Sequence, residues 1–241
     1  MMLNHITDEN AAKVVRYYRR WLESDNTDTS ELYEAHKALG FFAWRAGDTQ
    51  GMAEHLAKAA DVAIHAYAQG VSGNANVLNF CMPLKLCLLF GNQSIQDTLQ
   101  TIPRANFFNP ENEEFKPLAD LVDTLKTWRS SKPSESEIND LINNAGKGAA
   151  NFYYEPRIKN IAKGLLGVLQ KNISEVTEAL NNLIDLHMDE ALDGEYQLLE
   201  EGLMATWASV VYQCALGEGL DFPYANNYIP CEFLRARYLK K

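Results

Sequence analysis

The stretch that decides the fold is residues 29–67, TSELYEAHKALGFFAWRAGDTQGMAEHLAKAADVAIHAY. Apolar side chains recur in it at steps of three and four residues, first up to Gly47 and again after Thr49. This spacing places them on one face of an α-helix in each half. Gly47 can end the first helix and Thr49 can cap the second. The stretch therefore predicts two amphipathic helices that pack as a hairpin.

The same periodicity continues through most of the chain, and no alternation of polar and apolar residues is long enough to demand a strand. We expect helices at about 8–22, 30–46, 49–67, 75–90, 113–129, 134–146, 155–170, 174–190 and 195–217, and short ones after Ser94 and Pro230. The chain has 241 residues, enough for one large helical domain. The expected fold class is all-α, a single globular multi-helix domain over residues 1–241 with a possible internal seam at 130–136.

Two stretches are nearly free of charge. Between Val71 and Gln96 the charged residue is Lys85 alone, and residues 202–217 contain none. A membrane span needs about 20 predominantly apolar residues. The first stretch is interrupted by asparagines and by Pro83, and the second is too short. We expect both to be helices buried on nearly all sides, forming the inner layer of a bundle.

A tight turn followed by a capped helix recurs along the chain. Gly47-Asp48-Thr49, Asn172-Ile173-Ser174 and, more weakly, Gly91-Asn92-Gln93-Ser94 each precede an apolar helix stripe. Stacked hairpins of the tetratricopeptide type are punctuated in this way, although their consensus does not recur here. The pattern predicts antiparallel, repeat-like helical hairpins. The alternative is that any antiparallel helix pair needs such a turn and cap.

The composition is acidic, with 22 Lys+Arg against 32 Asp+Glu and a formal net charge of −10. A nucleic-acid binder needs a basic face to neutralise phosphates, so this balance argues against nucleic acid and disfavours anionic membranes. Residues 1–10 lack the basic start and apolar run of a secretory signal, so we expect a cytoplasmic protein. The cysteines form no CxxC pair, and we expect reduced, structural thiols at Cys81, Cys87, Cys214 and Cys231.

Motifs for catalysis or metal binding are missing from the sequence. It contains no GxSxG elbow, no HExxH pair and no complete phosphate-binding glycine loop. His36, His55 and His187 lie at or beside apolar stripes, where packed histidines are more common than metal ligands. Asp185 and Asp189 share a helix face, but His187 points nearly opposite, so the three are no chelating set. We therefore expect no enzyme activity, no metal and no cofactor.

The segment from Asp185 to Glu201, DLHMDEALDGEYQLLEE, concentrates negative charge. It has no Lys or Arg and seven carboxylates, which are Asp185, Asp189, Glu190, Asp193, Glu195, Glu200 and Glu201. Like charges within a Debye length of roughly 8 Å repel one another, which costs stability unless positive charge comes to them. We expect these seven residues to form a docking face for a basic protein. The alternative is a solvated acidic corner that aids solubility.

Aromatic residues cluster at two loop positions, Phe107-Phe108 and Phe152-Tyr153-Tyr154. Ring-rich loops can anchor an interface. The alternative is that these rings fold back as lids on their own core.

The last 60 or so residues carry a family resemblance. Its elements are His187, Ala191, a long helix with Trp207, Ala208, Tyr212 and Ala215, then Gly219-Leu220, Tyr228-Ile229-Pro230 and Phe233-Leu234. This pattern resembles the ending of the immunity protein 49 family, an all-helical family of bacterial polymorphic toxin systems. The amino-terminal helices agree with that family only in general character.

The resemblance implies a cytoplasmic immunity protein that binds a cognate secreted toxin domain and neutralises it by occlusion, protecting the producing bacterium and its kin. It carries over no catalytic residue. One alternative is a tetratricopeptide-like adaptor, which would present a concave groove to an endogenous peptide or protein. Another is a helical-bundle enzyme that gathers carboxylates around His187. The oligomeric state is left open.

Overall fold

The computed structural model describes residues 6–24, 28–70, 75–147 and 151–239, with the backbone alone at 151 and 152. The described residues form helices and no strand, which confirms the predicted all-α fold. The helices are α1 (Asp8–Leu22), α2 (Thr29–Arg45), α3 (Thr49–Ala68), α4 (Val77–Phe90), α5 (Gln93–Thr101), η1 (Arg104–Asn106), η2 (Glu113–Phe115), α6 (Lys116–Thr127), α7 (Glu135–Asn144), α8 (Asn151–Leu169), α9 (Ile173–Leu192), η3 (Glu200–Leu203), α10 (Thr206–Gly217) and α11 (Cys231–Tyr238), where η marks a short 3-10 helix.

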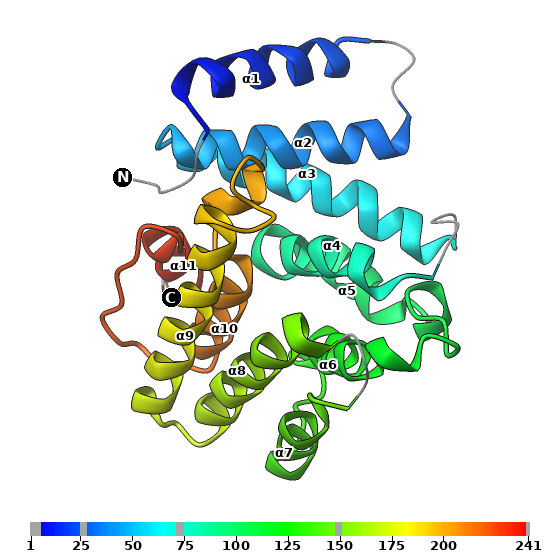
Figure 1. Ribbon diagram of the computed structural model, residues 1–241, viewed down its shortest axis with the longest axis vertical. Coiled ribbons are helices and arrows are strands. Elements are labelled where there is room, and N and C mark those ends of the chain that lie inside the picture. The colour runs from blue at the N-terminus through cyan, green and yellow to red at the C-terminus, as the bar shows by residue number, and fades with distance from the viewer. Residues whose placement is uncertain (1–5, 25–27, 71–74, 148–150, 240–241) are drawn as a thin grey trace.

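Helices α2 and α3 form the predicted hairpin (Figure 1). Asp28 caps α2 by accepting from the Glu31 N–H, and the Glu31 carboxylate accepts from the Asp28 N–H in return. Gly47 turns the chain with a φ of 77°, a left-handed conformation that glycine adopts without strain. Asp48 then caps α3, one residue before the expected Thr49.

The turn before α3 has a counterpart before α9. Lys171 has a φ of 56°, also left-handed, and Asn172 caps α9 directly after it. Asn92 caps α5 through the same kind of side-chain acceptor. The repeated turn-and-cap pattern in the sequence therefore corresponds to real helix starts.

Helices α4 and α10 form the inner layer, as their lack of charge predicts. All residues from Pro83 to Phe90 on α4 and from Ala208 to Leu216 on α10 are buried. Helix α10 packs against α4, α8, α9 and α11. Among the described helices, none is both long and apolar enough to cross a membrane.

The outer helices follow one another around an arc that closes on itself (Figure 1). After α9 the chain returns to the beginning, and η3 lies against α2. The seam at 130–136 falls between α6 and α7. Buried side chains on both sides of it, among them Trp128 and Ile138, belong to one apolar cluster.

The prediction of one helix over 195–217 is wrong in its first part. Helix α10 begins at Thr206, and the residues before it form turns and η3. At Gly202 the chain folds back so closely that a Cβ would lie 2.5 Å from the carbonyl oxygen of Tyr196. The apolar pattern continues through this segment and gave no sign of the break. Residues 193–205 are called the 193–205 segment below.

Gly40 marks the closest approach of α2 and α3. A Cβ at this position would lie 2.5 Å from the side chain of Leu56, which is fully buried. Gly→Ala in an uncrowded helix adds about 1 kcal/mol of stability, whereas overpacking a core costs about 1–3 kcal/mol. We expect Gly40→Ala to lower the free energy of unfolding measured in urea. A gain in stability would contradict this packing.

Candidate functional site

The acidic segment does not form one charged surface. Its outer carboxylates, which are exposed, are Asp185, Asp189, Asp193 and Glu195. Its inner carboxylates, whose side chains are only 13–14% exposed, are Glu190, Glu200 and Glu201. The docking face of seven residues expected from the sequence therefore divides into two sets with different surroundings.

Lys37 of α2 neutralises part of the inner set. Its Nζ lies 2.5 Å from Oε1 of Glu201, 3.7 Å from Oε1 of Glu200 and 2.8 Å from Oε2 of Glu34. The Lys37 side chain is 9% exposed, so the ion cluster is largely shielded from water. These contacts tie the 193–205 segment to the second helix of the chain.

The pKa values of this cluster reflect its burial. Burial alone would lower the pKa of Lys37, but the Glu201 carboxylate, with Glu34 and Glu200, outweighs it and raises that pKa. Burial, and then the charge of Glu201, raises the pKa of the Glu200 carboxyl. Lys37 is therefore held as a cation inside the protein.

Arg157 of α8 pairs with the third inner carboxylate. Its Nη2 lies 3.3 Å from Oε1 of Glu190, and its Nη1 donates to the carbonyl oxygen of Tyr153 at 2.6 Å. The other carboxylate oxygen of Glu190 accepts from the N–H of Glu195 at 3.1 Å, which holds the turn after α9. Residues 185–201 contain no Lys or Arg, and the cations that pair with their inner carboxylates come from α2 and α8.

The outer carboxylates have no such partners. None of them forms an ion pair with a described residue, and the last turn of α9 contains no basic residue. Asp189 and Asp193 lie at the end of a helix where the helix dipole is itself negative. Leu198 and Leu199 follow in the same segment and are 68% and 45% exposed.

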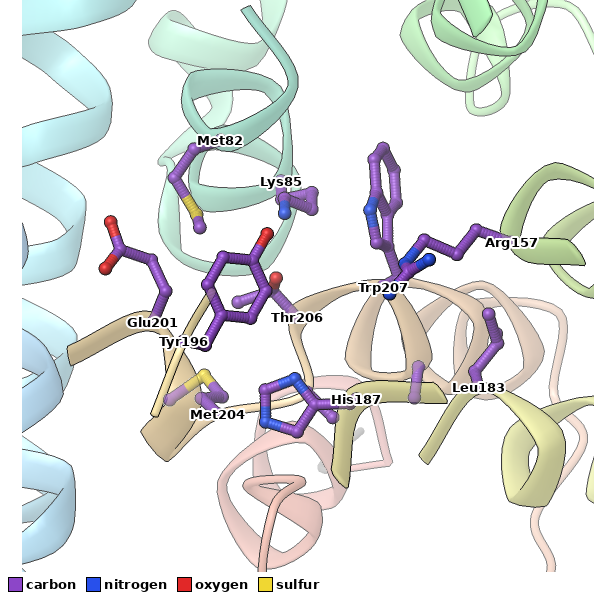
Figure 2. A pocket seen from close by; sticks show the side chains of 12 residues that line it. Met82, Lys85, Arg157, Leu183, His187, Tyr196, Glu201, Met204, Thr206 and Trp207 are labelled. Atoms are coloured by element: carbon purple, nitrogen blue, oxygen red, sulfur yellow. The ribbon is translucent and has the colours of Figure 1, made fainter. Parts of the chain in front are cut away.

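A small cavity lies against the 193–205 segment (Figure 2). Its volume is about 30 Å³, which is room for a water molecule or two or a small ion. The polar side chains that line it come from several elements: Lys85, Arg157, His187, Tyr196, Glu201 and Thr206. Trp207 at the start of α10 forms one of its walls.

Lys85 is the unusual member of this cavity. It is 5% exposed, and no described residue accepts a hydrogen bond from it or forms an ion pair with it. Its Nζ lies 4.6 Å from the centre of the Trp207 ring, a cation–π contact. Burial lowers the pKa of Lys85 to about 8.

His187 lies in the same cavity as a neutral side chain. Its Nε2 is 3.1 Å from the carbonyl oxygen of Gly202, and burial lowers its pKa to about 4. Glu201, which pairs with Lys37, is the carboxylate among the cavity residues. The cavity thus lacks the converging carboxylates that a bundle enzyme built on His187 would need. In the described part of the chain, no three His, Cys, Asp or Glu side chains are grouped to hold a metal.

The aromatic pairs expected at loops have other roles. Phe107 and Phe108 are buried in the apolar core, which confirms the alternative that these rings fold back on their own core and corrects the interpretation of them as interface anchors. Tyr153 and Tyr154 are half-buried, and the guanidinium of Arg157 lies 3.8 Å from the centre of the Tyr153 ring. The side chain of Phe152 lies outside the described residues. All four cysteines are buried free thiols, which agrees with a structural role.

Several site residues were missed at the sequence level. Lys37 and Arg157 look like ordinary charges on amphipathic helices, and nothing local links them to residues far along the chain. Lys85 did carry a signal, because it is the isolated charge within the apolar stretch 71–96. Leu198 and Leu199 fall within residues 195–217, for which the sequence predicts one continuous helix, so their exposure could not be foreseen.

Comparison of the chain with protein-family models, curated proteins and solved structures finds no match. The resemblance to the immunity protein 49 family therefore rests on the C-terminal residues alone.

Acid should weaken the fold through its histidines. Burial, together with the neighbouring His55, lowers the pKa of His36 to about 4, and the Nδ1 atoms of the two rings are 2.9 Å apart. His187 has a similarly low pKa. Because the unfolded chain binds these protons near pH 6.5 and the folded chain only near pH 4, stability falls as the pH drops between those values.

We expect His187→Gln to reduce this acid sensitivity. At pH 5 a buried histidine of this kind costs about 2 kcal/mol relative to pH 7, and the amide can still donate to Gly202. Urea unfolding at pH 7 and pH 5 measures the difference, with the exposed His65→Gln as control. If the two variants lose equal stability on acidification, His187 is not buried in its neutral form.

Proposed function

We propose that this protein is an immunity protein that binds a toxin domain with a basic surface and blocks it by occlusion. The observation that carries the proposal is that residues 185–199 include both exposed leucines and exposed carboxylates without an ion pair to a described residue, and we call these side chains the outer face. This outer face consists of Asp185, Asp189, Asp193, Glu195, Leu198 and Leu199. The resemblance to the immunity protein 49 family supplies the toxin as the partner.

The electrostatics of the outer face favour a basic partner. The inner carboxylates are largely buried and contact Lys37 or Arg157 within the protein, so they are not free to meet a partner. The outer carboxylates repel one another, and Asp189 and Asp193 lie at the negative end of α9. Lysine or arginine side chains brought by a partner would relieve this repulsion and speed the encounter.

The leucines supply the apolar part of such an interface. Leu198 and Leu199 are two of the four large hydrophobic side chains that are exposed among the described residues. Exposed apolar side chains rimmed by charge are typical of protein–protein contacts. Burying them against a partner would provide affinity, while the outer carboxylates would provide orientation and specificity.

The alternative adaptor function finds less support in the fold. A tetratricopeptide-like adaptor binds its peptide on the concave side of the helical arc. Here α10 packs inside the arc, against α4, α8 and α9 (Figure 1). The chain's own helix thus takes the place that a bound peptide would occupy.

Co-expression with the product of the adjacent gene tests the function. Cells that express the toxin domain should survive when this protein is present, and the two proteins should purify as a complex. A chain that neither rescues cells nor forms a complex with that product would sink the proposal.

The interface is tested by two variants of the outer face. Leu198→Asp with Leu199→Asp should weaken binding by at least about 30-fold, as expected for buried anchor residues. Charge reversal to Lys at Asp189, Asp193 and Glu195 should lower the association rate about tenfold and reduce its salt dependence. Stopped-flow binding at two salt concentrations measures both effects.

Reversal of the same number of charges elsewhere is the control. Glu111, Glu113 and Glu114 are exposed and lie before α6, so changing them to Lys alters net charge equally without touching the outer face. Equal losses from both charge reversals would show a general charge effect. Unchanged binding by the leucine variant would remove the outer face from the interface.

A further inference from the structure

Two N–H groups in the first turn of α10 have no hydrogen-bond partner among the described residues. Ala205 precedes the helix and provides no side-chain cap. The N–H of Thr206 bonds to Met204, and the N–H of Ser209 is the first to bond back to a carbonyl of the preceding turn, that of Ala205. The backbone N–H groups of Trp207 and Ala208, which lie between them, have no such bond. Both residues line the cavity.

This helix start differs from those of the other α-helices that the structure describes without a side-chain cap. Helix α6 begins at Lys116 and Pro117, and α11 follows Pro230. Proline has no N–H, so its presence reduces the number of donors that need an acceptor. Helix α10 has neither a capping side chain nor a proline, and its N-terminal turn is buried.

Lys85 reaches this turn from α4 (Figure 2). Its ammonium group carries three donors, none of which has an acceptor among the described residues. A buried cation without an acceptor is costly. The ring of Trp207 compensates for part of this cost, but a ring face cannot accept all three N–H groups.

The neighbouring charges leave Lys85 without a counterion. Arg157 is paired with Glu190, and Glu201 is paired with Lys37. Lys85 is therefore the cavity-lining cation that forms no ion pair with a described residue. The positive end of the α10 dipole adds to its charge.

We propose that Lys85 and the N-terminal turn of α10 bind one small monovalent anion, a halide or an oxyanion as small as formate. Backbone N–H groups at a helix start and a lysine ammonium are common donors to anions. The cavity volume of about 30 Å³ excludes nucleotides and sugar phosphates. The hydroxyl of buried Thr206, which lines the same cavity, can donate to the ion as well. This site does not depend on the toxin partner, and a failure of either proposal leaves the other standing.

Bromide is a suitable probe, because it is a heavy ion that quenches indole fluorescence on contact. In the titration, sodium bromide replaces sodium sulfate so that the ionic strength stays constant. The fluorescence of Trp207 should then fall with increasing bromide and reach a plateau. Lys85→Met keeps the side-chain length and should remove the saturable part, lowering the affinity at least about tenfold. Lys163→Met removes an exposed lysine and should leave the titration unchanged.

The pH dependence of binding provides a second readout. Because the pKa of Lys85 is about 8, the ammonium is present at pH 7 and is lost at higher pH. Bromide affinity should therefore fall as the pH rises from 7 to 9. The other titratable and charged groups that face Lys85 or contribute to its pKa are Cys81, Arg157, His187, Tyr196, Glu201 and Lys37.

Crystals soaked in bromide test the position directly, whether or not the Lys85 variant folds. An anomalous peak within hydrogen-bond distance of Lys85 Nζ and the backbone N–H of Trp207 would confirm the site. No peak there, or a saturable quench that persists in Lys85→Met, would overturn the proposal.

Discussion

The ion cluster around Lys37 is the contact on which the rest of the structure depends. It joins α2 to Glu200 and Glu201, which lie more than 160 residues further along the chain. By holding η3 against α2, it closes the helical arc (Figure 1). It also sets the path of the 193–205 segment, with Tyr196 and Glu201 facing the cavity and Leu198 facing solvent. A buried charge left without its partner costs several kcal/mol, so this closure is strongly enforced.

The same cluster gives the acidic segment two roles. Its inner carboxylates are structural, because they are largely buried and contact Lys37 or Arg157 inside the protein. Its outer carboxylates are exposed to solvent, as are Leu198 and Leu199 in the same segment, and these are the residues we assign to partner binding. Four of the seven carboxylates in the acidic segment are thus exposed to solvent, and the other three are largely buried.

Local patterns predicted much of the fold. Helix periodicity identified the α2–α3 hairpin, and the absence of charge identified α4 and α10 as inner helices. The break before α10 was not predicted, because the fold-back depends on the missing side chain of Gly202 beside the carbonyl of Tyr196, and one glycine within an apolar pattern is a weak signal. For the site, the sequence located the acidic residues but could not separate inner from outer ones. That division depends on cations from other helices, and neither periodicity nor spacing encodes such long-range pairs.

The central claim is that Lys37 and Glu201 hold each other inside the protein, and a double-mutant cycle tests it most directly. Urea unfolding would compare the wild type with Lys37→Met, Glu201→Gln and the double variant. We predict that Lys37→Met alone costs about 3–5 kcal/mol, since it leaves buried carboxylates unpaired. The double variant should lose about 1–3 kcal/mol less than the sum of the single losses. Additive losses, or a Lys37→Met variant as stable as the wild type, would contradict the account.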